Sequence, residues 1–262
     1  MHELYDETLQ KLMANGILRP DMSILVCCGG AADRDALRRQ GFGNVLITNI
    51  RSLNENEFAP YGFSEQDAEQ LTLPDDSFDF CAVQSGLHHC RSPHQALLEM
   101  YRVAKKGVLL LEPGDTLISR LGARLGFGQE YEHHAVTPQG GGVANTPIPN
   151  YVYRWTRNEI RKTISSFAPH ARHRFLFFDR LDVHWGSCRR KKCRWYYYIM
   201  LAGYPLLKAL NLCFPRLTSN SFGAVILKPT LPADLHPWLS DDKGKVIVNT
   251  ECLDRIRHRQ PV

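Results

Sequence analysis

DAEQLTLPDDSFDFCAVQSGLHHCRSPHQALLEMYRVAKKGVLLLEP, residues 67–113, contains two apolar runs separated by a polar turn and a helical pattern. The first run, Phe78–Gln84, predicts a buried strand. Pro93–Lys105 has apolar residues at helical spacing, and Gly107 is expected to end that helix before a second strand, Val108–Leu111. Strand, loop, helix and strand in this order predict a parallel sheet with crossover helices. The polar turn then lies at the carboxyl edge of the sheet, where ligands bind.

The flanking sequence continues the same alternation in both directions. Gly29 and Gly30 stop a short apolar run, and Gly41 and Gly43 end the helix that follows. We expect further helices over 3–18, 33–40 and 156–167, and further strands at 24–27, 45–50, 174–178 and 222–227, with a short third strand within 51–66. These elements predict an α/β fold: a Rossmann-like, doubly wound, mostly parallel seven-stranded sheet with helices on both faces.

One domain is expected over residues 1–228, with two insertions and a polar C-terminal tail at 229–262. Residues 114–150 lose periodicity and include a glycine-rich stretch, which predicts a mobile lid rather than core. Residues 182–220 form a second, helical insertion before the last strand.

The composition is that of a globular protein with a sizeable core. The 262 residues carry 32 basic and 27 acidic side chains, a net charge of +5, which is weak for a nucleic-acid-binding surface. The N-terminal sequence MHELYDETLQ lacks an apolar signal region, and eight cysteines without a signal favour a reducing compartment. We therefore expect a cytoplasmic protein that does not bind nucleic acid.

The turn after the first strand has the features of a nucleotide-binding loop. Small residues at Cys27–Ala32 allow a ligand to approach the backbone, and the following helix N-terminus favours negative groups. Asn49 ends the second strand 19 residues after Gly30, close to where Rossmann folds place a ribose-binding acid. By itself, such a turn can equally be a tight connection.

The block from Asp67 to Pro113 closely resembles class I S-adenosylmethionine-dependent methyltransferases, in particular the branch with quinone and sterol methyltransferases. The resemblance covers about residues 20–180 and implies S-adenosylmethionine as cofactor. The cofactor-binding positions it implies are Cys28, Gly29, Gly30, Asn49, Asp67, Ala68, Ser85 and Leu87. Asp67 matches the residue that meets the adenine amino group, with the Ala68 N–H beside it.

The ribose side departs from the family pattern. Val26 stands where the family has an acid, Cys28 and Ala32 replace glycines, and Asn49 replaces the ribose-binding carboxylate. The CCGG turn and the segment Pro149–Trp155 are also similar to a narrower group encoded with surface-polysaccharide biosynthesis genes.

Methyl transfer requires in-line approach of a nucleophile and usually removal of a proton. His88 and His89 are the candidate bases, or they cap the next helix. In the lid, His133 and His134 form a polar cluster with the neighbouring residues Glu130, Tyr131 and Glu132, which either contacts substrate or belongs to a solvated loop. A cation and two aromatic faces come together at Tyr153, Arg154 and Trp155. These residues either bind a sugar or an anionic substrate, or they pack against the lid. No metal site is expected, because adjacent histidines rarely reach one ion and no distant partner is evident.

The second insertion is basic and then apolar. Residues 189–194 are rich in lysine and arginine, and 195–214 are aromatic and aliphatic. Pro205, Lys208 and Asn211 argue against a membrane span, so the pattern indicates either peripheral membrane contact through 189–214 or a buried helix pair. Its position at the carboxyl end of the sixth strand suggests contact with a lipid-linked substrate at the inner face of the membrane.

The sequence therefore predicts a methyltransferase acting on a small-molecule or glycan acceptor. We expect O-methylation of a sugar or another amphiphilic acceptor in surface-polysaccharide biosynthesis. This acceptor can be linked to a lipid. A quinone or isoprenoid acceptor is the alternative within the same chemistry. A degenerate methyltransferase fold that only binds ligands is a second class, favoured by Val26, Cys28 and Asn49. A nicotinamide-dependent oxidoreductase is a third, but the full glycine fingerprint is missing.

Overall fold

The computed structural model describes residues 2–183, 185, 195–241 and 243–258. Seven strands form one sheet in the order β3-β2-β1-β4-β5-β7-β6, and only β7 runs antiparallel to its neighbours. The strands are β1 Ser23–Cys27, β2 Asn44–Asn49, β3 Gly62–Glu65, β4 Phe78–Gln84, β5 Ala104–Pro113, β6 Arg174–Arg180 and β7 Ser221–Leu227. The strand order reverses between β1 and β4, which makes this the topological switch point. The predicted fold class is confirmed.

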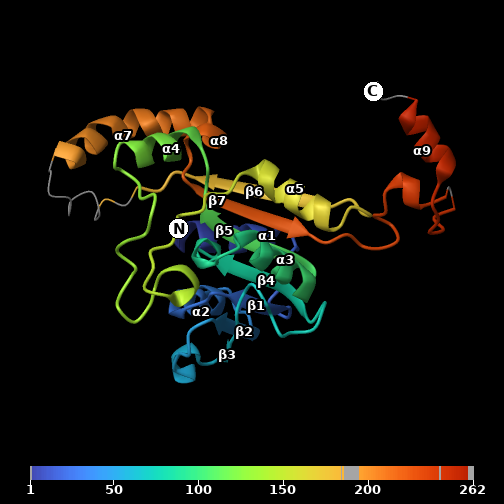
Figure 1. Ribbon diagram of the computed structural model, residues 1–262, viewed down its shortest axis with the longest axis horizontal. Coiled ribbons are helices and arrows are strands. Elements are labelled where there is room, and N and C mark those ends of the chain that lie inside the picture. Colours follow the sequence, from blue (N-terminus) through green and yellow to red (C-terminus); the bar gives the residue numbers. More distant parts are fainter. Residues whose placement is uncertain (1, 184, 186–194, 242, 259–262) are drawn as a thin grey trace.

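Helices cover both faces of the sheet (Figure 1). On one face, α1 His2–Ala14 and α2 Ala31–Arg39 share an apolar cluster with Ile24 and Val26 of β1. On the other, α3 Pro93–Val103 and α5 Arg157–Phe167 pack with Leu25 and Cys27 of the same strand. Successive residues of β1 thus pack into the apolar clusters on opposite faces of the sheet, as expected for a strand buried on both sides.

The predicted boundary between α3 and β5 is wrong. The helix ends at Val103, and Ala104 and Lys105 already belong to β5. Ala104 pairs with Phe78 of β4, so backbone hydrogen bonding in the sheet competes with continuation of the helix. Gly107 is not a helix terminator but a position of close approach: an added Cβ would lie 2.6 Å from the Ile226 carbonyl oxygen and 2.8 Å from the Phe80 ring.

Both insertions lie at the carboxyl edge of the parallel strands. The last residues of β5 and β6, Pro113 and Arg180, both pair with Ser221, the first residue of β7. The lid segment, residues 114–150, therefore begins where β5 ends. It carries α4 Leu117–Arg124 and the short η3 Val143–Asn145. The second insertion carries α7 Trp195–Cys213 and α8 Pro215–Thr218, and α8 packs against α4 (Figure 1).

Other short elements connect or extend this framework. Two 3-10 turns, η1 Glu55–Phe58 and η2 Leu87–His89, precede β3 and α3. Beyond β7, η4 Pro237–Leu239 and α9 Thr250–Arg257 extend away from the sheet (Figure 1).

Candidate functional site

A pocket opens at the topological switch point, at the carboxyl ends of β1, β2, β3 and β4. Its cavity volume is about 230 Å³. Its sheet side is lined by Cys28, Asn49, Ile50, Arg51, Asp67, Ala68, Glu69, Ser85 and Gly86, and η2 and its C-cap contribute His89 and Cys90. Gly141, Gly142, Ala144 and Asn145 of the lid segment close the opposite side.

Four non-glycine residues that line this pocket have positive φ. The φ angles are 53° at Cys28, 54° at Ser85, 48° at Ala144 and 58° at Asn145. Such conformations cost L-residues free energy and concentrate at functional sites. Two of the four come from strand ends and two from the lid segment, so backbone strain is present on both sides of the pocket.

Asn49 braces the turn after β1. Its Nδ2 donates to the Gly29 carbonyl oxygen at 2.9 Å, and its Oδ1 accepts from the Arg51 N–H at 3.1 Å. A carboxylate could not make the first of these bonds, because it has no hydrogen to donate. Asparagine at this position is therefore matched to the local backbone, and its Oδ1 keeps a second lone pair toward the pocket. Gly29 lies against β1 and β2, where an added Cβ would be 2.7 Å from Val26 Cγ1.

Asp67 and Ala68 form the wall opposite the glycine turn. Asp67 Oδ1 accepts from the Glu69 N–H at 2.9 Å, which fixes the carboxylate in a local turn at the pocket. Ala68 is buried, and its backbone borders the same space. Glu69 accepts from the backbone N–H groups of Arg91 and Ser92 at 2.9 and 2.8 Å, so it ties this wall to the start of α3.

His88 lies beneath the pocket and is held by a buried glutamate at the end of β5. Its Nδ1 is 2.7 Å from Glu112 Oε2, while Glu112 Oε1 accepts from the N–H groups of Gly86 and Leu87, each at 2.8 Å. Burial alone would lower the pKa of His88, but the carboxylates of Glu112 and Glu132 outweigh it and raise the pKa to about 10. At neutral pH His88 is therefore an imidazolium, which opposes its predicted role as a general base.

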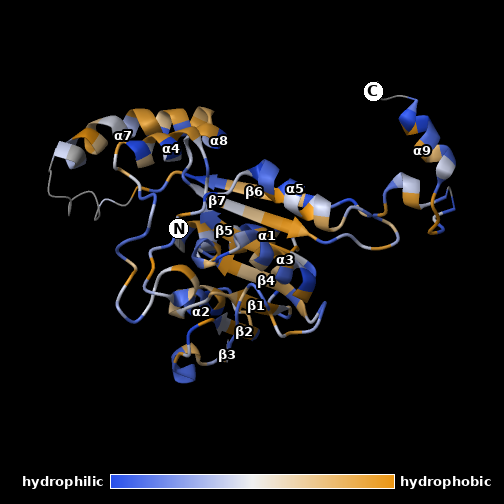
Figure 2. Cartoon of the chain, viewed as in Figure 1, coloured by the Kyte–Doolittle hydropathy of each residue, from blue (hydrophilic) through white to orange (hydrophobic). Residues whose placement is uncertain are grey.

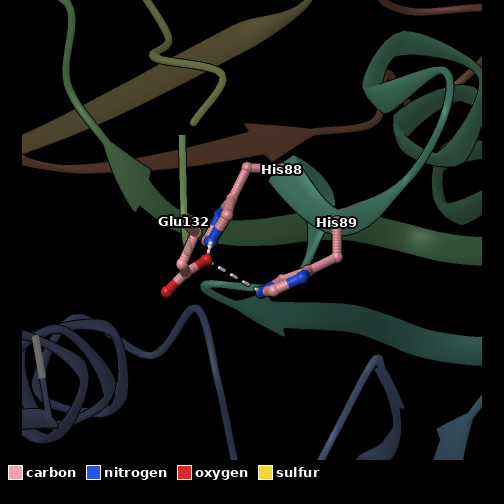
Figure 3. A group of neighbouring side chains, drawn as sticks. All are labelled: His88, His89 and Glu132. Atoms are coloured by element: carbon pink, nitrogen blue, oxygen red, sulfur yellow. Dashed lines mark ion pairs between the residues drawn. The ribbon is translucent and has the colours of Figure 1, made fainter. Parts of the chain in front are cut away.

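His89 points toward the same lid carboxylate from the pocket side. Glu132 Oε2 lies 3.5 Å from His88 Nε2 and 3.4 Å from His89 Nε2, as Figure 3 shows. Burial and the neighbouring His88 charge lower the pKa of His89. The hydrogen bond to His88 lowers the pKa of Glu132 to about 2. Of the two predicted bases, only His89 lines the pocket in a form that can accept a proton, and the base role stays a prediction.

The remaining sequence candidates are spread over three environments. Leu87 is fully buried in the core, and neither Gly29 nor Gly30 belongs to the residues that line the pocket. His133 and His134 are exposed on the lid segment. Trp155 is buried beneath β5, which agrees with the packing alternative for that side chain.

Tyr153 and Arg154 line a second, polar pocket between α4 and α5, with a cavity volume of about 480 Å³. The Tyr153 hydroxyl donates to Glu159, and the Arg154 guanidinium donates to the Gln129 carbonyl oxygen at 2.5 Å. The substrate role of Tyr153 and Arg154 stays a prediction.

The sequence pattern placed Glu132 in the polar lid cluster but not beside His88, and it did not single out Glu112 or Asn150. The only signal for Glu112 was an acid directly after the apolar run Val108–Leu111. Asn150 is buried and donates to the His88 carbonyl oxygen at 3.1 Å and to Glu132 Oε2 at 3.3 Å. Glu132 and Asn150 both belong to the lid segment, whose path over the sheet no local pattern specifies.

Comparisons with known proteins agree with this geometry. A family model described as "Methyltransferase domain" matches residues 25–111, from β1 to β5. The ubiquinone/menaquinone biosynthesis C-methyltransferase UbiE of Laribacter hongkongensis is 37% identical over 107 residues, which are 36% of this chain and 43% of that protein. The Bdellovibrio bacteriovorus protein of the same name is 34% identical over 93 residues, 35% and 38% of the two chains. The match thus spans less than half the length of either relative.

Solved structures show the same fold over a longer stretch. A SAM-dependent methyltransferase from Archaeoglobus fulgidus superposes with a TM-score of 0.51 at 12% identity, covering 87% of this chain and 95% of the other. The methyltransferase in a complex with the Haloferax volcanii Trm112 activator superposes with a TM-score of 0.53 at 14% identity, covering 88% and 92%. Residues 25–111 thus match the methyltransferase-domain family, and the chain shares its fold with solved S-adenosylmethionine-dependent methyltransferases.

Proposed function

We propose that this protein transfers a methyl group from S-adenosylmethionine to an amphiphilic acceptor at a membrane surface. The observation that carries the proposal is the pocket at the switch point between β1 and β4, with Asp67, Asn49 and the strained turns at Cys28 and Ser85 around it. This is the place where an open α/β sheet binds its ligand.

The residues present fit the cofactor. The Asp67 carboxylate accepts only one hydrogen bond within its turn, so it can accept another from the adenine amino group. The Asn49 Oδ1 can accept from a ribose hydroxyl while its amide stays bonded to Gly29. Cys28, Ser85 and Gly86 leave backbone exposed to the centre of the pocket. When bound, S-adenosylmethionine supplies an electrophilic methyl group on its sulfonium.

The protein's own part is positioning and exclusion of water. Glu112 holds the β4–η2 turn through two backbone hydrogen bonds, which fixes Ser85 and Gly86 beside the reacting centre. The lid segment contacts the pocket through Gly142, whose backbone carbonyl accepts a hydrogen bond from the His89 ring. An acceptor bound between His89 and the lid would be held for in-line attack and screened from solvent.

An exposed apolar surface at the same edge of the sheet supports the membrane part of the proposal. Leu117 and Leu121 of α4 and its C-cap residue Leu125 are 67%, 46% and 51% exposed and lie one turn apart. Figure 2 shows apolar residues along α7 and α8, which lie next to α4. We call this set the edge surface: Leu117, Leu121, Leu125, Tyr198, Ile199, Leu201, Leu206, Leu210, Leu212, Phe214 and Leu217.

Exposed apolar areas of this kind mark interaction sites, and basic residues beside them suit anionic lipids. The basic stretch 189–194 lies outside the described residues, so its predicted lipid contact rests on the sequence. Within the described ranges, no helix is both long and apolar enough to cross a bilayer. We therefore place the protein peripherally at the cytoplasmic face of a membrane, as part of the proposal.

Two acceptor classes fit this arrangement. A quinone or other isoprenoid ring suits the edge surface, and the relatives that match about a third of this chain are named ubiquinone/menaquinone biosynthesis C-methyltransferases. A lipid-linked saccharide, as in surface-polysaccharide biosynthesis, also carries an apolar anchor and stays a prediction. The exposed leucines of α4 favour an acceptor with an apolar part in both cases.

Titration calorimetry with S-adenosylhomocysteine tests the cofactor assignment. Asp67→Asn keeps the turn with the Glu69 N–H but presents an amide donor to the adenine amino group, so we expect about tenfold weaker binding, or ~1.4 kcal/mol. Glu55→Gln, an exposed change on η1, is the matched control and should bind as the wild type does.

The same titration separates the competing classes. A nicotinamide dinucleotide that binds while both sulfur ligands fail at millimolar concentration would contradict the proposal in favour of an oxidoreductase. Tight S-adenosylhomocysteine binding without methyl transfer to quinone or lipid-linked saccharide acceptors in vesicles would favour a binding module.

A further inference from the structure

Two histidines and a glutamate gather at the junction of η2 and the lid segment. The candidate ligand atoms of His88, His89 and Glu132 all lie within 4.8 Å of one another. In Figure 3 both imidazole rings present a nitrogen to the same carboxylate. Two imidazole rings in their neutral form and one carboxylate make up a donor set that binds first-row transition metals in proteins.

The distances suit a metal ion. Glu132 Oε2 is 3.5 Å from His88 Nε2 and 3.4 Å from His89 Nε2. Two ligand atoms that are each bound to zinc at its usual length, at the tetrahedral angle, are roughly 3.4 Å apart. The two ring nitrogens lie within 4.8 Å of each other, so small side-chain adjustments bring all three ligand atoms to one ion.

The outer partners match those of metal-binding histidines. Such a histidine almost always gives its second ring hydrogen to a carboxylate or a backbone carbonyl, which orients the ring. His88 Nδ1 is 2.7 Å from Glu112 Oε2, with Glu112 fully buried and fixed by two backbone N–H groups. The His89 ring hydrogen-bonds the backbone of Gly142. Asn150 Nδ2 donates to Glu132 Oε2 at 3.3 Å, so every member has an orienting contact.

We propose that His88, His89 and Glu132 bind a divalent transition-metal ion of the zinc, manganese, iron or cobalt class. The ion replaces the hydrogen between His88 Nε2 and Glu132 Oε2, and that proton leaves to solvent. Three protein ligands leave one or more open coordination positions, as in catalytic rather than structural sites. His89 lines the cofactor pocket, so an open position on that side is within reach of an acceptor oxygen.

A metal ion at this site would have two effects that are not expected if the histidines act as general bases. The ion would fasten the lid segment to η2, because Glu132 comes from the lid. It would also act on an acceptor oxygen as a Lewis acid, with His88 and His89 serving as ligands rather than as free bases. The inference goes beyond the proposed methyl transfer and does not depend on it.

Metal titration of the tag-free, chelator-treated full chain tests the site. We expect one Zn²⁺ to bind per chain in calorimetry, and Co²⁺ to give the visible absorption of a site with nitrogen and oxygen ligands. Glu132→Gln and His89→Gln should each weaken Zn²⁺ binding at least ~10-fold. These two side chains are about one-third exposed, so their replacement should leave the fold intact.

Neighbouring surface histidines provide the control. His133→Gln and His134→Gln change exposed rings on the same lid segment and should bind Zn²⁺ as the wild type does. Failure of the wild type to bind Zn²⁺, Mn²⁺ and Co²⁺, or equal Zn²⁺ affinity in Glu132→Gln, would overturn the proposal. S-adenosylhomocysteine titration of the chelator-treated protein reports the cofactor pocket independently, so loss of one site is distinguishable from loss of the other.

Discussion

Asp33 is an acidic side chain buried at the first turn of α2. Its Oδ2 accepts from the Gly30 N–H at 2.9 Å, but its Oδ1 is buried without a hydrogen-bond partner. Burial raises the pKa of Asp33 to about 6, whereas an unfolded chain has a value of ~3.9. Between these two values the folded protein binds more protons than the unfolded one. The free energy of unfolding therefore falls as pH rises through this window and stays lower above it.

Asp33→Asn should remove this pH dependence, because the amide carries no charge and its oxygen can still accept from Gly30. We expect the free energy of unfolding at pH 7 to rise by about 1–3 kcal/mol, and its slope between pH 4 and 6 to flatten. Urea denaturation at several pH values measures both. Asp35→Asn on the same helix is the control, since Asp35 is half exposed beside Arg34. An unchanged slope in Asp33→Asn would contradict the prediction.

At the scale of single residues, sequence patterns identified residues that follow the ends of strands. They did not identify the residues that contact these side chains in the folded protein. Asp67 comes shortly after β3, and Ser85 and His89 come shortly after β4, so the order of the strands predicts their position. The structure places all three at one pocket. Glu112 and the contact of Glu132 with His88 were missed because they depend on which segments the fold brings next to His88. No periodicity encodes a contact between β5, η2 and a loop of the lid segment.

Among the elements, α7 combines exposure with apolar composition. Leu206 and Leu210 lie one turn apart and are 66% and 42% exposed. Trp185 packs edge-on against Tyr197 and Tyr204, which attaches one side of the helix to the preceding segment. The other side is exposed and apolar, and it is the face that we propose contacts the membrane. This exposure favours the membrane alternative over the buried helix pair.

We expect the wild type to float with anionic vesicles at low salt, and Leu206→Asp with Leu210→Asp to reduce the bound fraction at least fivefold. Each exposed leucine contributes apolar burial on binding, and each aspartate adds repulsion from anionic lipid. Val246→Asp with Val248→Asp, two exposed residues far from the carboxyl edge, is the matched control. Equal flotation of all three proteins would remove the edge surface from the proposal, and absence of wild-type flotation would remove the membrane.

Element types were predictable where periodicity was strong, and boundaries were not. Phe78–Gln84 was placed correctly because a turn bounds it at either end. The α3–β5 boundary was missed because Gly107 signals a helix end locally, whereas its actual constraint is the Ile226 backbone 2.6 Å from where a Cβ would stand. That constraint comes from β7, far along the chain.

For the molecule as a whole, the predicted boundary between the domain, residues 1–228, and the C-terminal tail, residues 229–262, can be tested by truncation. Lys228 Nζ donates to the carbonyl oxygens of Tyr101 and Ala104, and Leu235 bridges to Ala171, so residues up to this point are attached to the domain. Beyond them, α9 packs on η4.

A variant ending at Ser240 should therefore keep its midpoint of thermal unfolding within about 3 °C and bind S-adenosylhomocysteine unchanged. Differential scanning calorimetry and titration measure the two quantities. A variant ending at Leu227 is the comparison, and it should unfold at clearly lower temperature because it loses the Lys228 and Leu235 contacts. A large drop in the Ser240 variant would show that the tail belongs to the domain.

Pro113 and Arg180, the last residues of β5 and β6, both pair with Ser221. The lid segment and the edge surface therefore lie at the carboxyl edge of the sheet, as the pocket does. The opposite side, with the turns around Gly43 and Asp75, carries none of the residues assigned to the site. A fluorophore or an immobilising tether attached there would leave ligand exchange and vesicle docking unobstructed. The protein is thus naturally suited to oriented attachment on a sensor surface, with its reactive side facing the solution.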